Sequence, residues 1–284
     1  MQGVTIGAGD IDAKLAGGKV EFAPMDVPVS EGRVLLAPTV LLDRSPMLVT
    51  LPAGPLVDRV RISPQMCTGW FKYIAPLVAD ATAAQGTFSV SLDRAAIPLD
   101  VPSAGEVEGV LEIHTAQIGP GPLSQQLLLL AAQIKAIADG NLLGAPTAPT
   151  ERWLDLPQQR IAFRMAENRV YHEGLQMSAK DVVIRTSGSV GTDQTIALIA
   201  EVPVRDEWLS RSQHLAAFRG QSIKIPIHGT LTNPKLDQNA LTQITQQAVT
   251  GAANQYIQGG VKQLDSELNK QLNRGLEKLF GAPR

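Results

Sequence analysis

Histidine and cysteine, the residue types that most often bind metals or act as nucleophiles, are rare and scattered in this chain. Its four histidines show no metal-ligand spacing such as HExxH, so we expect each to lie at the surface or on a strand face. They are His114, His172, His214 and His228. The single cysteine, Cys67, allows neither an intrachain disulfide nor a cysteine-based zinc cluster, and beside Met66 and Trp70 we interpret it as a buried, inert thiol.

Other short motifs also fail to predict catalysis. GSVG at 188–191 differs from the nucleophile elbow because Ser187, rather than Gly, stands two residues before Ser189. GVTIGAGD at 3–10 lacks the third glycine of a phosphate-binding loop. No pair among the 27 carboxylates has a recognisable acid/base setting. We therefore expect a protein that is not an enzyme and that needs no cofactor or metal.

Composition narrows the class of partner. The chain has 284 residues, a net charge of −2 and no basic block, so nucleic acid is not expected as a partner. Charged residues make up 18%, below the roughly 25% of a typical soluble domain, which suggests that apolar surface is exposed or turned inward. The first residues have no signal-peptide pattern, and no apolar run is long enough to span a bilayer. Because they resemble mid-strand sequence, we expect the chain to be the tail of something longer or an engineered fragment.

Alternating apolar residues predict strands joined by short turns. Hairpins are expected across Gly17-Gly18, across Glu167-Asn168 and across residues 191–193. A further strand, 222–231, contains Pro226, which cannot donate to a ladder, so we expect it at a sheet edge or a bulge.

Two helices are predicted between the strands. Ser63 and Pro64 are a typical N-cap and first helical residue, and predict a helix near 64–76 that ends or kinks at Pro76. A second helix is predicted near 122–138 and ends before Gly140. Its apolar stripe is Leu123, Leu127, Leu130, Ile134 and Ile137.

The fold class is thus predicted to be α+β and mainly antiparallel β, in three regions. Residues 1–145 form a β-rich region with the two inserted helices, 146–236 a second β-sheet region, and 237–284 an amphipathic helical tail. The tail's leucine stripe is a candidate partner-binding surface, and packing on a sheet or a partner is favoured over membrane contact because its polar face has few cations. The stripe is Leu264, Leu268, Leu272, Leu276 and Leu279.

The C-terminal third resembles the C-terminal region of AsmA-like proteins. The resemblance rests on TSGSVGTDQTIALIAEVPV (186–204), SIKIPIHGTLTNPKLD (222–237) and the Gln- and Leu-rich tail containing GLEKLFG. It implies a curved or U-shaped sheet with an apolar concave face, in periplasmic, envelope-associated proteins that move phospholipid toward the outer membrane. The chain departs from the family pattern by lacking an N-terminal anchor and by inserting two helices.

An apolar sheet face could hold lipid without specific polar contacts, since burying an acyl chain is favourable by about 0.8 kcal/mol per methylene. We therefore expect a lipid-handling module of the cell envelope that contributes to outer-membrane biogenesis. The alternatives are an ordinary closed core under the helices, a scaffold or assembly factor that docks an envelope partner through its tail, and an enzyme on envelope polymers, for which no polar cleft is predicted. The candidate lipid-binding residues are Phe88, Val90, Leu92, Ile161, Phe163, Met165, Ile184, Ile196, Leu198, Ile223, Ile225 and Ile227.

Overall fold

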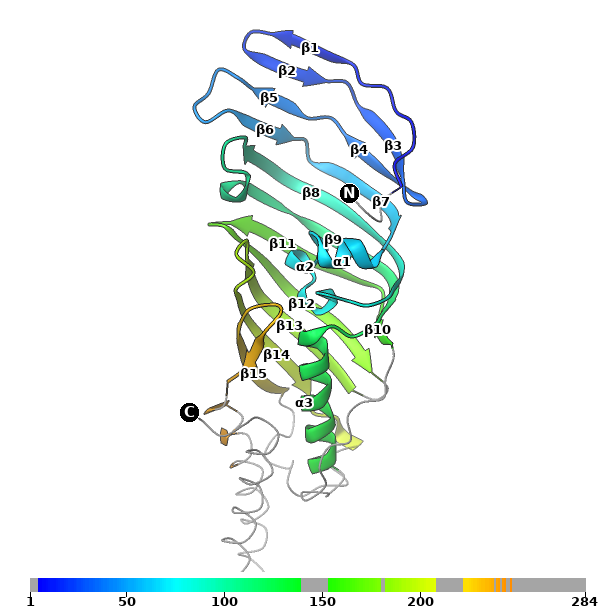
Figure 1. The fold of residues 1–284 in the computed structure, drawn as a ribbon, viewed down its shortest axis with the longest axis vertical. Coiled ribbons are helices and arrows are strands. Elements are labelled where there is room, and N and C mark those ends of the chain that lie inside the picture. The colour runs from blue at the N-terminus through cyan, green and yellow to red at the C-terminus, as the bar shows by residue number, and fades with distance from the viewer. Residues whose placement is uncertain are drawn as a thin grey trace, which may run out of the picture.

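One sheet, in which every strand pairing is antiparallel, dominates the computed structural model (Figure 1). The structure describes residues 5–138, 153–179, 182–207 and 222–237, together with 239, 240, 242, 243 and 246. The α-helices of this part of the chain lie in front of one face of the sheet. The fold is therefore α+β and mainly antiparallel β, as predicted. The predicted tail stripe, Leu264 to Leu279, lies outside the described residues.

Prolines divide the first strands of the sheet into two branches. Pro24, Pro38 and Pro52 lie in the breaks that separate β2 from β3, β4 from β5 and β6 from β7. A proline has no N–H to give to a ladder, so strands are interrupted at such points. One branch is β1-β2-β5-β6 and the other is β3-β4-β7. The strands are β1 (Ala13–Ala16), β2 (Lys19–Phe22), β3 (Met25–Val29), β4 (Gly32–Leu36), β5 (Thr39–Leu41), β6 (Leu48–Leu51) and β7 (Gly54–Arg61).

Both branches join the long strand β8 (Ala84–Pro98), which pairs with β6 and β7 on one side and with β9 (Glu106–Ile118) on the other. β9 pairs in turn with β10 and β11, so the sheet continues past residue 145, where the sequence suggested a regional boundary. The remaining strands are β10 (Leu154–Leu156), β11 (Gln159–Ala166), β12 (Arg169–Ala179), β13 (Val182–Gly191), β14 (Ile196–Pro203), β15 (Ser222–Gly229) and β16 (Pro234–Leu236).

The predicted hairpins are confirmed: β1 pairs with β2, β11 with β12, and β13 with β14. The strand containing Pro226 was predicted to lie at a sheet edge or to carry the proline at a bulge. Both placements were wrong, because β15 pairs with β14 through Pro226 without a register shift and also with the short strand β16. The carbonyl of Pro226 accepts a hydrogen bond from the Asp237 N–H just beyond β16. Pro226 therefore lacks its N–H on the side of β16, beyond the end of that strand. No hydrogen bond of the β15–β16 ladder is lost there.

The first predicted helix is present but broken earlier than expected. Ser63 caps α1 (Pro64–Thr68) by accepting a hydrogen bond from the Met66 N–H, and α1 then ends at Gly69 rather than continuing to Pro76. The chain turns there and continues as α2 (Phe71–Ile74) and the 3-10 helix η1 (Pro76–Val78). We call residues 62–79 the helical insert. The second predicted helix is α3 (Pro122–Ala138), and a 3-10 turn, η2 (Pro102–Ala104), lies between β8 and β9.

The apolar stripe of α3 packs into the core. Leu123, Leu127, Leu130 and Ile134 are buried, whereas the side chain of Ile137 lies outside the described residues. Residues of the helical insert, α3 and one sheet face form a single hydrophobic cluster. Among the described residues, no helix combines the length and apolar character needed to cross a membrane.

Candidate functional site

The sheet face that carries the helices, here called the inner face, is lined by apolar side chains that align from strand to strand. Directly paired residues in antiparallel strands project from the same side, so the pairing register identifies each row. We call the first the valine row; it crosses six strands from β3 to β11. It consists of Val27, Val34, Val57, Val90, Leu111 and Ile161.

A second apolar row runs beside it from β6 to β14. It consists of Leu51, Ala95, Val107, Met165, Val170, Val190 and Ile196. Because each row joins strands distant in sequence, the apolar surface of the inner face is continuous across the predicted boundary between the two β regions. Such continuity is what a surface for long apolar chains requires.

A third row contains the one histidine buried in the described residues. It consists of Leu92, Gly109, Phe163, His172, Gly188, Leu198, Ile227 and Leu236. The Nε2 atom of His172 lies 3.2 Å from Thr186 Oγ1, while its Nδ1 atom has no hydrogen-bond partner. Burial lowers the pKa of His172 to about 4, so the ring is neutral near pH 7.

All the candidate lipid-binding residues predicted from the sequence are on the inner face, and all except Met165 are buried. The buried ones are also members of the cluster that includes the helices. Phe88, for example, has its ring centroid 5.0 Å from Phe71 and 5.7 Å from Trp70, both in or beside the helical insert. At Phe88 the helical insert therefore occupies the space that a ligand would need.

The open part of the inner face lies elsewhere, at the end of the sheet formed by β1, β2, β5 and β6, where no described helix covers the strands (Figure 1). Val20 pairs with Val40, Val40 with Val49, and Val49 with Ile97, which continues the apolar inner face. All four are only half-buried. We call this region, with the half-buried Val27 and Val34 of the valine row, the open end.

The candidate list from the sequence omitted the open end. The alternation in KVEF (19–22) and in LVTL (48–51) was available as a signal, but these strands are only four residues long. A four-residue alternating run is weak evidence for an apolar sheet face by itself. Such runs become informative only when the pairing register shows that their apolar residues align.

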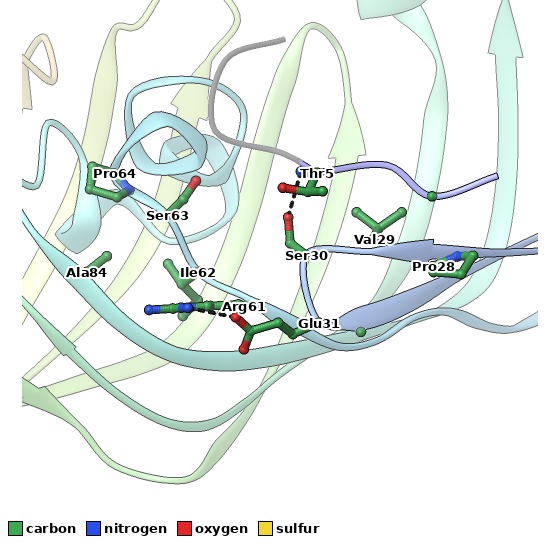
Figure 2. Close-up of a pocket in the computed structure, with 12 residues that line it drawn as sticks. Thr5, Pro28, Val29, Ser30, Glu31, Arg61, Ile62, Ser63, Pro64 and Ala84 are labelled. Atoms are coloured by element: carbon green, nitrogen blue, oxygen red, sulfur yellow. Dashed lines mark hydrogen bonds and ion pairs between the residues drawn. The ribbon is translucent and has the colours of Figure 1, made fainter.

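A pocket of about 770 Å³ lies where the open end meets the helical insert. Figure 2 shows it between the segment at Thr5, the β3–β4 turn at Ser30 and Glu31, and the start of α1 at Pro64. The Arg61 Nη1 atom lies 2.7 Å from Glu31 Oε1, and the Ser30 hydroxyl accepts a hydrogen bond from the Thr5 N–H. The polar side chains of this pocket thus join the segment at Thr5, the β3–β4 turn and the end of β7.

Cys67 and the histidines of the described residues differ in burial. Burial raises the pKa of Cys67 to about 12, so its thiol stays protonated at neutral pH, as expected of an inert buried cysteine. No group of three or more His, Cys, Asp or Glu within the described ranges has an arrangement that could hold a metal ion. His114 and His228 are not buried, and His214 lies outside the described residues.

Comparisons with models of protein families, with curated proteins and with solved structures found no match to this chain. The inner face is therefore the feature that bears on function.

Proposed function

We propose that this protein is a non-enzymatic lipid-handling module that holds acyl chains on the open end of its inner face. The observation that carries the proposal is the continuous apolar row Val20, Val40, Val49 and Ile97, half-buried and with no helix of the described residues over it. A soluble domain normally covers such a face, because water contact with aligned apolar side chains is unfavourable. An acyl chain would supply the missing cover.

The proposal follows the resemblance to AsmA-like proteins in its biological setting. It places the protein in the periplasm or at the cell envelope, with phospholipid or another acyl lipid as its ligand and outer-membrane biogenesis as its process. A curved or U-shaped sheet and a long C-terminal helix belong to the same proposal. The valine row and the second apolar row each cross several strands, and neighbouring strands lie about 5 Å apart. A ligand that follows such a row is therefore longer than one strand spacing, as an acyl chain is.

The direct test is to purify the full chain without detergent and to examine it by native mass spectrometry followed by lipid extraction. The proposal expects phospholipid bound in a reproducible ratio. A stable, lipid-free monomer would contradict it and would favour the alternative, an envelope scaffold that acts through residues 237–284.

A matched pair of variants locates the lipid. Val49 and Leu48 are neighbours in β6, but Val49 pairs with Val40 and Ile97 on the inner face, whereas Leu48 pairs with Leu41 and Pro98 on the outer one. Val49→Asn is expected to lower the bound lipid severalfold, because it places an amide in the apolar row. Leu48→Asn removes more apolar surface but should leave the lipid ratio unchanged. Equal losses from both variants would show that the lipid does not lie on the inner face.

A further inference from the structure

Two neighbouring turns at one side of the open end carry exposed, large apolar side chains. The β5–β6 turn spans residues 42–47, and the connection from β8 to β9 begins at Leu99; Figure 1 shows both on the same side of the sheet. Leu42 is 42% exposed, Met47 45% and Leu99 44%. We call these three residues the lip.

The lip forms one further apolar row rather than three unrelated residues. Leu41 pairs with Leu48 and Leu48 with Pro98. Continued by one residue, this register would bring Leu42 beside Met47 and Met47 beside Leu99. The Leu99 N–H donates to the Met47 carbonyl at 2.9 Å, which extends the ladder between β6 and β8 into the turns. Alternation along each strand puts the lip on the inner side, next to Val40, Val49 and Ile97.

The charges beside the lip are of both signs. Asp43, Arg44 and Asp100 are all exposed and follow the lip residues in the two turns. Such a surface offers no excess of positive charge to an anionic membrane or to nucleic acid. It complements a zwitterionic headgroup layer, in which a phosphate and an ammonium group lie side by side.

We propose that the lip inserts into the surface of a phospholipid bilayer and is the place where lipid passes between the membrane and the open end. The inference rests on the proposed function, since it assigns an entry point to the lipid-holding face. An aligned apolar row can enter the headgroup boundary and gain free energy by leaving water. The same row leads directly to Val40 and Val49, so an acyl chain would not have to cross a polar surface.

The test compares flotation of the full chain with neutral phosphatidylcholine vesicles for the wild type and for the triple variant Leu42→Ser, Met47→Ser and Leu99→Ser. The variant is expected to bind at least about tenfold less, because three apolar side chains are lost from the contact. Wild-type binding should change little between about 0.1 and 1 M salt, since charge is not its driving force. Ile199→Ser is the matched control: Ile199 is 49% exposed, in β14, and faces the outer side of the sheet.

Several results would overturn the proposal. These are equal flotation of the triple variant and the wild type, binding that needs anionic lipid and is lost in salt, or a wild-type dimer in sedimentation that the triple variant abolishes. The last result would make the lip a contact between copies of the chain. Thermal unfolding of the triple variant checks that it remains folded, as expected for exposed positions.

Flotation and native mass spectrometry test insertion of the lip and the proposed function separately. Wild-type protein that carries lipid in native mass spectrometry but does not float would contradict insertion of the lip into a bilayer and would support the proposed function. Lipid-free wild-type protein that floats, when the triple variant does not, would support insertion of the lip and contradict the proposed function. If both proposals hold, the triple variant should keep its bound lipid while its rate of lipid exchange with vesicles falls at least about tenfold.

Discussion

The open end and the helix-covered part of the sheet have the same kind of inner face but differ in what lies over it. Val27 and Val90 belong to one row, are the same residue type and project from the same side, yet Val27 is half-buried and Val90 is 5% exposed. The strands alone do not cause this difference, because both valines lie within β-strands and belong to the same row. The helical insert and α3 cause it by packing on one part of the face and not on the other.

The comparison implies that the two regions depend on different sources of stability. In the covered part, the apolar side chains form one buried cluster with residues of the helices and are removed from water, at about 25 cal/mol per Å² of apolar surface. At the open end, the same side chains recover only part of that free energy. The open end should therefore tolerate substitutions that the covered part does not.

The largest effect is expected from Phe88→Ala in the covered part. Phe88 is 1% exposed and packs against Phe71 and Trp70, so the truncation should leave a cavity and lower the free energy of unfolding by about 4 kcal/mol. Urea denaturation measures this loss. Phe88→Leu, which keeps most of the volume, should cost clearly less. A loss below about 1 kcal/mol for Phe88→Ala would mean that the insert does not pack as a fixed cover.

The second effect concerns His172, which lies in an apolar row of the covered part. Its pKa is lowered from 6.5 to about 4 by burial, so the folded state resists protonation and the unfolded state does not. The neutral ring favours folding above pH 6.5, and this contribution is lost as pH falls toward 4. The difference amounts to about 3 kcal/mol.

The check is to measure unfolding by urea at several pH values for the wild type and for His172→Gln. The variant should lose less stability than the wild type between pH 6.5 and 4, because glutamine does not titrate. His228→Gln, at an exposed position on β15, is the control for replacing a histidine by glutamine. Parallel profiles for all three proteins would show that His172 is not held neutral by burial.

Local sequence patterns predicted the elements but not their alignment. The hairpin across Glu167-Asn168 was predictable, because two residues that tolerate positive φ separate two alternating runs, and their φ values are indeed 55° and 59°. The sequence indicated the inward-facing position of His172 less clearly than it indicated this hairpin. Apolar alternation passes through Val170 and His172, then shifts to Leu175 and Met177, and this shift marks the bulge between His172 and Leu175.

The open end could not be identified from the sequence, because its definition depends on contacts between distant segments. Whether Val40 or Val90 lies under a helix is decided by how the helical insert folds back on β8 and by the early end of α1 at Gly69. Neither is encoded in the alternation of the strands. The candidate list consequently favoured the most regular strands, which are the ones that the helices cover.

The third effect compares the same substitution in the two regions. Val→Thr keeps the shape of the side chain and adds a hydroxyl, so it reports mainly on access to water. Val90→Thr should cost about 2 kcal/mol, because the hydroxyl would be buried without an assured partner. Val40→Thr should cost less than about 0.5 kcal/mol in lipid-free protein, because water reaches the half-buried position.

Urea denaturation of both variants after lipid removal provides the measurement, and adding lipid sharpens it. Bound lipid should stabilise the wild type more than Val40→Thr, since the variant places a hydroxyl under the acyl chain. If the two variants lose equal free energy of unfolding without lipid, water reaches Val40 no more than Val90. The open end and the covered part would then not differ in exposure to water.

The smallest effect tests whether the boundary between the two regions is fixed. The helical insert reaches the β13–β14 turn through two long hydrogen bonds, from Lys72 Nζ to Gln194 Oε1 and from the Tyr73 hydroxyl to the Thr192 carbonyl, both 3.4 Å. Lys72→Met with Tyr73→Phe removes both and should lower the free energy of unfolding by less than about 0.5 kcal/mol, because bonds of this length contribute little.

Cys67 reports on the insert directly, because it is the chain's only cysteine and is fully buried within the insert. If apolar packing holds the insert on the sheet, the rate at which a thiol reagent labels Cys67 under native conditions should stay within about twofold of the wild-type rate in the double variant. Faster labelling without a change in global unfolding would mean that the two hydrogen bonds are a latch. The insert would then be a movable cover, and the covered part would become available to lipid when it opens.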